Sequence, residues 1–187
     1  MVQHAFDPPE RCIAGSVGPP GQRTFFLQVS GEGRVVSVSL EKEQVRLLGE
    51  SLAELLDEVA GEAGSPEHGE RYADTAPLDT PIEDDFRVQR LSVAWEGDRQ
   101  RVVIEAFDRP EAADLLELEE DGDEPGDFPW SGLPPQSLRV VLAPGQARAF
   151  AHRCTASLEG GRPSCPFCGQ PLDPSGHICP RANGYRR

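Results

Sequence analysis

The stretch that decides the fold is RVVSVSLEKEQVRLLGESLAELLDEVA, residues 34–60. In its first part, Val36, Val38 and Leu40 alternate with serines, which is the period of a strand with one buried face. From about Glu41 the apolar residues recur every three or four positions, which is the period of an amphipathic helix. The stretch therefore predicts a half-buried strand that runs directly into a helix.

Further elements are predicted on both sides of this stretch. Short apolar runs bounded by turn residues predict five more strands. They span residues 12–17, 24–29, 86–95, 101–107 and 137–142. A second helix is predicted at 144–157. The stretches 61–85 and 108–136 are expected to be long connections, because glycine, proline and acidic residues dominate them.

The two halves of the chain are similar at their strand-to-helix junctions. Residues 38–48 can be laid on residues 140–150 with leucine, glutamine and arginine coinciding. We therefore predict an α+β fold with a possible internal duplication, in which each half is a β-meander followed by a helix. A single sheet covered on one face by both helices would bury the two apolar stripes. Leu52 and Phe150 are accordingly expected to be buried.

The clearest chemistry lies near the C-terminus, where three thiols and one imidazole follow the pattern C-x2-C-x8-H-x-C. They are Cys165, Cys168, His177 and Cys179. Structural zinc sites take four nitrogen or sulfur ligands, often with the first two on a C-x2-C turn. The pattern predicts a zinc-ribbon-like appendage at residues 161–187, attached to an α+β core domain at residues 1–160.

Alternatives to this ligand set exist. A lone C-x-x-C is also the pattern of a redox dithiol, but Gly169, Pro171 and Pro174 oppose the helix that a thioredoxin-like motif requires. His152 or Cys154 are alternatives to His177 as the fourth ligand. Four protein ligands would leave no open position, so a structural role is expected for the zinc.

Composition narrows the classes of partner and compartment. The formal net charge is −14, which disfavours nucleic acid as a partner because its affinity for proteins comes largely from phosphate neutralisation by Lys and Arg. The sequence has no apolar run long enough for a membrane span and no apparent signal peptide. An odd number of cysteines, five, suits a reducing cytoplasm better than a disulfide framework.

The second long connection is strongly acidic. Between Glu111 and Asp127 there are nine acidic residues, a bias typical of disordered segments. Phe128 and Trp130 follow directly. They are candidate anchors for a protein partner with a basic surface, although they are also suited to holding the loop on the domain.

Several segments of the chain resemble an uncharacterised family of actinobacterial proteins. They are Phe6–Arg11, Gly21–Gln28, Leu40–Val45, Cys165–Gly169 and His177–Tyr185. The resemblance spans nearly the full length, with the acidic middle as its variable part. It implies a bacterial cytoplasmic origin but indicates no particular activity, since the family is a domain of unknown function.

Two functions are compatible with the sequence. The first is a zinc-stabilised protein-binding or regulatory module in the cytoplasm. The second is an enzyme, a hydrolase or transferase, with its active site in a cleft between the two halves near Arg23. Gln22 and Arg23 carry donors suited to an anion, so they are candidate anion-binding residues. The sequence contains none of the common catalytic motifs, such as a P-loop or a G-x-S-x-G elbow, and this favours the binding module.

Overall fold

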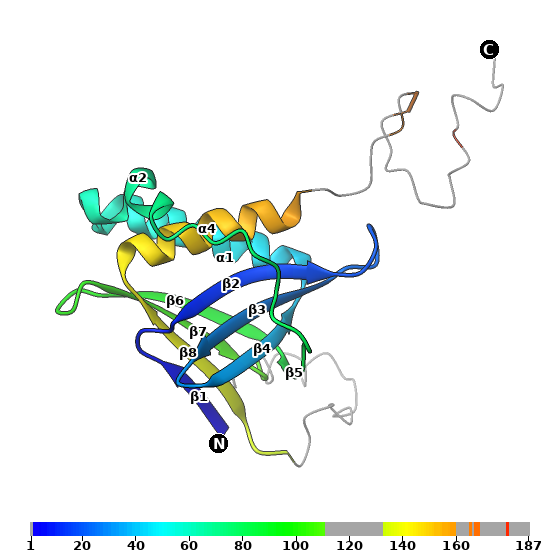
Figure 1. The fold of residues 1–187 in the computed structure, drawn as a ribbon, viewed down its shortest axis with the longest axis horizontal. Helices are drawn as coiled ribbons and strands as arrows, with labels where there is room; N and C mark the ends of the chain where they lie inside the picture. Colours follow the sequence, from blue (N-terminus) through cyan, green and yellow to red (C-terminus); the bar gives the residue numbers. More distant parts are fainter. Residues whose placement is uncertain (1, 111–132, 160–164, 166, 169–178, 180–187) are drawn as a thin grey trace, which may run out of the picture.

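The computed structural model describes residues 2–110, 133–159, 165, 167, 168 and 179. Its strands form two four-stranded sheets (Figure 1). The first sheet has the order β2 (Arg11–Val17), β3 (Thr24–Gly31), β4 (Arg34–Leu40), β5 (Asp84–Arg87). The second has the order β1 (Val2–Phe6), β8 (Gln136–Leu142), β7 (Arg101–Phe107), β6 (Arg90–Glu96).

Both sheets are built in the same way. Each contains an antiparallel meander of three strands, β2–β3–β4 or β6–β7–β8. Each adds a fourth strand that is parallel to the last strand of the meander, β5 beside β4 and β1 beside β8. The fourth strand of each sheet therefore comes from the other half of the chain. In the register, Phe86 lies opposite Val38, and Phe6 lies opposite Val140.

Two long helices follow the last strands of the meanders. Helix α1 (Lys42–Val59) follows β4, and α4 (Pro144–Leu158) follows β8. They pack side by side, with α4 also against β2 and α1 against β6 (Figure 1). Because β2 and β6 are edge strands of different sheets, the helix pair bridges the two sheets along one side. None of the helices among the described residues has the length and apolar composition that a membrane crossing needs.

One hydrophobic core joins both sheets and both helices. The first sheet contributes residues such as Leu27 and Val38, and the second contributes residues such as Ile104. Leu52 of α1 and Phe150 of α4 are buried in the same core, with 0% and 2% of their surface exposed. The prediction that the apolar stripes of both helices are buried is confirmed.

The prediction of a single sheet and of one strand at 86–95 was wrong. The chain crosses from the first sheet to the second between Val88 and Gln89. The N–H of Val88 donates to the carbonyl of Ser39 in β4 at 2.9 Å, and the next N–H, that of Gln89, donates to the carbonyl of Phe107 in β7 at 2.8 Å. Residues 86–95 contain no glycine or proline, so their composition did not reveal the change of sheet.

Other elements were missed in segments predicted to be irregular. No strand was predicted before residue 12, but β1, which contains His4, lies there. The connection at 61–85 contains a short 3-10 helix (Gly61–Gly64), the helix α2 (Pro66–Glu70) and the start of β5. The predicted bounds of β4 and β7 agree with the structure.

Residues 72–83, which we call the strap, cross the face of the first sheet that is turned away from the main core. Leu78 and Ile82 of the strap pack there against Ile13 and Phe26. Leu78 can approach β2 this closely because Gly15 has no side chain. A Cβ at Gly15 would lie 2.8 Å from the Cγ of Leu78. The strap thus gives the first sheet a second, small apolar layer.

Candidate metal centre and surface pockets

Three cysteines from the end of the chain lie together. The sulfur atoms of Cys165, Cys168 and Cys179 are all within 4.8 Å of one another. The Sγ atoms of Cys165 and Cys179 are 3.8 Å apart. A tetrahedral zinc ion with Zn–S bonds of about 2.3 Å requires sulfur atoms separated by about 3.8 Å. The arrangement therefore fits a tetrahedral thiolate-bound metal.

The turn between the first two cysteines favours a thiolate. Burial raises the pKa of Cys165, but the main-chain N–H groups of Cys168 and Phe167 and the thiols of Cys168 and Cys179 form hydrogen bonds to its sulfur. The net effect holds the pKa of Cys165 below its ordinary value. Since the thiolate is the form that binds metals, this turn prepares the first ligand.

The other cysteines are of a different kind. All five are free of disulfide bonds. Burial raises the pKa of Cys154 to about 12 and raises that of Cys12 further, so both thiols are protonated at neutral pH. Cys154 is fully buried against Gly49, and His152 is exposed on α4. Neither joins the cysteine cluster within the described part of the chain, and His177 lies outside the described residues.

Phe167 stands between the first two cysteines and exposes 62% of its surface. It is thus an aromatic side chain on a short turn whose two ends are candidate metal ligands. Phe128 and Trp130, predicted to contact a partner, lie outside the described residues. Phe167 was not singled out from the sequence, because aromatic residues within a C-x2-C turn carry no separate pattern.

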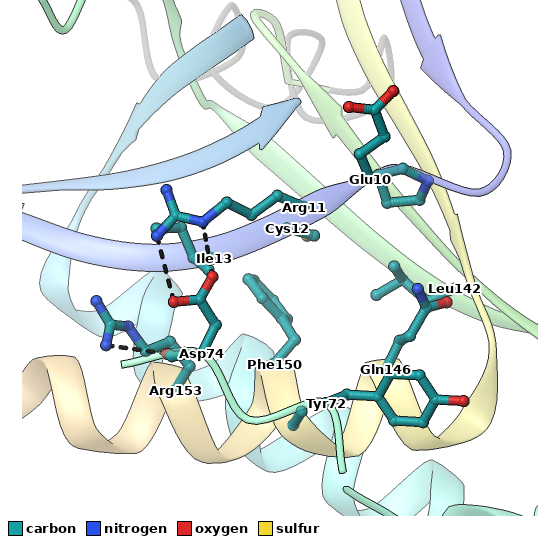
Figure 2. A pocket seen from close by; sticks show the side chains of 12 residues that line it. Glu10, Arg11, Cys12, Ile13, Tyr72, Asp74, Leu142, Gln146, Phe150 and Arg153 are labelled. Atoms are coloured by element: carbon teal, nitrogen blue, oxygen red, sulfur yellow. Dashed lines mark hydrogen bonds and ion pairs between the residues drawn. The ribbon is translucent and has the colours of Figure 1, made fainter. Parts of the chain in front are cut away.

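The pocket in Figure 2 lies between the start of β2, the strap and α4, and has a volume of about 100 Å³. One wall is the ion pair of Arg11 and Asp74, with a distance of 2.6 Å between Nε and Oδ2. Gln146 and Tyr72 lie on the other side, and Phe150 lies between the two walls. Arg11 also binds Asp79 at 3.0 Å and two carbonyls of the strap. The charges of this pocket therefore serve mainly to hold the strap.

A second pocket, of about 340 Å³, contains Arg23. The sequence singled out Gln22 and Arg23 as candidate anion-binding residues. Arg23 lines the pocket together with Arg153 of α4, whereas Gln22 is exposed on the preceding turn and is not part of the lining. Arg153 was missed because a single arginine on a helix gives no sign of which loop it meets.

Comparisons with known proteins give one result. Neither the curated proteins nor the solved structures include a match to the chain. A family model described as a protein of unknown function, DUF3090, matches residues 4–179. The match covers both sheets, both long helices and all three clustered cysteines. The chain therefore belongs to the DUF3090 family.

Proposed function

We propose that this protein is a zinc-stabilised protein-binding module. The observation that carries the proposal is the cluster of Cys165, Cys168 and Cys179, with the exposed Phe167 on the turn between its first two members. A metal bound to these sulfurs would fix the turn, so Phe167 would meet a partner with little further loss of conformational freedom. Aromatic side chains held in this way are frequent anchors of protein interfaces.

Zinc is the metal that fits these ligands best. Three thiolates are soft donors, and tetrahedral sulfur-rich sites in proteins are typical of zinc or of iron–sulfur centres. The cluster of three cysteines, completed by His177, would give the Cys3His set of structural zinc sites. We further propose that the protein works in the bacterial cytoplasm, in actinobacteria, where free thiols and a thiolate metal site persist.

The partner is expected to have a basic surface. The chain carries a formal net charge of −14, with its densest acidic run immediately before Phe128 and Trp130. Charged segments of this kind steer oppositely charged partners and make association sensitive to salt. We propose that these two residues act with Phe167 as apolar anchors, while the acidic run supplies the attraction. A regulatory role would follow from control of that partner.

The test is capture of partners by the purified protein, compared across variants. Phe167→Ala, Trp130→Ala and Cys165→Ser should each lose the proteins that the wild type recovers. Tyr72→Ala is the matched control, because Tyr72 is an aromatic residue with 49% exposure that lies outside the proposed surface. Recovery of the same proteins by all variants would contradict the proposal, as would recovery that does not fall with rising salt.

We also propose that the two halves arose by duplication. Three features support it: the shared strand-to-helix sequence, the two meanders that each gain a parallel strand from the other half, and a shared glutamine cap at the start of the two long helices. In both helices a glutamine three residues into the junction accepts a hydrogen bond from the main chain, Gln44 from Glu41 and Gln146 from Ala143. Homologous sequences aligned half against half would test this directly.

A further inference from the structure

The pocket lined by Arg23 and Arg153, which we call the arginine pocket, brings two cations together in an acidic protein. Arg23 comes from the end of the β2–β3 turn, and Arg153 comes from α4. Between them the wall is formed by Ser16 and Gly18 on one side and by Ser157 and Glu159 on the other. With a volume of about 340 Å³, the pocket has room for a small polar molecule.

Arg153 is held in place by main-chain carbonyls. Its Nε donates to Ala14 at 2.8 Å, and its two terminal nitrogens donate to Asp74 at 3.2 Å and Ala76 at 2.8 Å. A guanidinium carries more N–H donors than these three bonds use. Carbonyls fix the position of the group without removing its charge, so Arg153 keeps both a positive charge and donors for a further ligand.

Arg23 is fixed at the opposite rim. Its Nη1 donates to the carbonyl of Glu159, at the end of α4, at 3.0 Å. The turn that carries Arg23 is tight, because Gly18 has a φ of 108° and a side chain there would meet the carbonyl of Gln22 at 2.6 Å. The guanidinium therefore reaches the pocket from a well-defined loop.

The edge of β2 adds a main-chain donor. The carbonyl of Ala14 faces α4, since it accepts the bond from Arg153. In an antiparallel strand the main-chain groups alternate between the two sides, so those of Ser16 face the same way as those of Ala14. Ser16 lines the arginine pocket, and the alternation places its N–H on the side that faces α4.

We propose that the arginine pocket binds a small oxyanion: phosphate, sulfate or a carboxylate. Guanidinium groups bind such anions through paired, charge-assisted hydrogen bonds, and main-chain N–H groups extend the same coordination. Three features oppose the anion: the carbonyl end of α4, the carboxylate of Glu159 and the carboxylate of Asp74 near Arg153. They offset part of the attraction of the two guanidiniums, so the expected affinity is modest, in the millimolar range. This site is independent of the cysteine cluster.

The experiment is calorimetric titration of the full chain with sodium phosphate, sodium sulfate and sodium acetate at constant ionic strength, with sodium chloride as the baseline. Arg23→Gln should weaken binding by about tenfold, the value of one charge-assisted hydrogen-bonded pair. Arg101→Gln is the matched control, because Arg101 also donates to carbonyls but lies at the start of β7 in the other sheet. It should change the affinity by less than about twofold. The three salts decide which oxyanion fits.

Glu159→Gln gives a result of the opposite sign. Removal of the carboxylate from the rim should tighten binding by about two- to fivefold, a gain that loss of structure cannot imitate. The thermal midpoint of each variant shows whether Arg23→Gln remains folded. Absence of saturable binding to the wild type would overturn the proposal. Equal affinities of the Arg23 and Arg101 variants, or no gain in Glu159→Gln, would do the same.

Discussion

Gly49 of α1 lies directly against Cys154 of α4. A Cβ built at Gly49 would lie 2.9 Å from the Cβ of Cys154 and 3.3 Å from the carbonyl oxygen of Ala151. At this point the backbone of α1 therefore lies against the side chain of Cys154 in α4. The contact depends on the absence of a side chain at Gly49. The contact lies within the helix pair that joins the sheets, because α1 packs on β6 and α4 on β2.

Gly49→Ala should consequently lower the free energy of unfolding by about 1 kcal/mol or more, since overpacking of a tight contact outweighs the gain in helix propensity. Urea denaturation measures the change. Ser51→Ala, on the exposed side of the same helix, should have almost no effect. A Gly49→Ala protein that is more stable than wild type would mean that the contact between the helices can accommodate a methyl group.

Removal of the glutamine caps should destabilise both long helices, though unequally. Gln146→Ala should cost about 1 kcal/mol, because the N–H of Ala143 loses its acceptor. Gln44→Ala should cost more, since Gln44 also donates to the carbonyl of Val88 at 3.2 Å, at the point where the chain changes sheet. Gln146→Glu keeps the acceptor and serves as the control. Chemical denaturation that ranks the two alanine variants in the reverse order would contradict this account.

Release of the strap should follow from a change at Gln28. This buried side chain accepts the N–H of Asp79 at 2.7 Å and donates to the carbonyl of the same residue at 3.1 Å. Gln28→Met conserves volume but leaves those groups unpaired, at a cost of about 1–3 kcal/mol. Limited proteolysis should then cut within residues 72–83 sooner than in wild type or in Gln89→Met, a change at an exposed position. Unaltered protection would show that the apolar contacts of Leu78 suffice.

Stability in acid should depend on Asp74. A hydrogen bond from Arg11 lowers the pKa of Asp74 below its ordinary value of 3.8; burial opposes this, and the N–H of Ala76 adds to it. A carboxyl whose pKa is lower in the folded state stabilises the protein above the unfolded pKa, and the contribution is lost as pH falls through the folded pKa. Asp74→Asn should therefore lower stability at neutral pH by about 1 kcal/mol and narrow the gap to wild type in acid.

The control for this pH dependence is Asp98→Asn, which removes the same charge from an exposed turn. Denaturant midpoints measured from neutral pH into the acid range decide the outcome. If the curves of the two variants run parallel, the ion pair with Arg11 is not the source of the acid sensitivity.

Metal binding should require each of the three clustered cysteines. Purified protein should contain about one zinc per chain, and Cys165→Ser should lose it because three sulfurs no longer surround the ion. Cys12→Ser, a change at a cysteine outside the cluster, should retain it. Protons compete with the metal for the thiolates, so zinc should be released as pH falls. Full zinc content in Cys165→Ser would rule out the cysteine cluster as the site.

Sequence periodicity predicted the elements whose signals are local. Residues 34–60 carry their own periodicity, and the C-x2-C spacing of Cys165 and Cys168 predicts the turn of the metal site. The missed features depend on distant partners. β1 has no pattern of its own and is a strand only because β8, far along the chain, accepts it. Similarly, the role of Arg153 rests on carbonyls of a strand and a loop, which no spacing in the sequence encodes.

The exchange of β1 and β5 between the two halves also affects folding during synthesis by the ribosome. A nascent chain that ends near residue 110 already contains β1 and all of the first sheet, but β1 must wait for β8, its partner in the register. The first sheet is complete once β5 has emerged, whereas the second closes only when residues 136–142 have left the exit tunnel. Pairings of such long sequence separation form late and slowly. Until then Phe6, which is buried in the completed core, lacks the strand that holds it there.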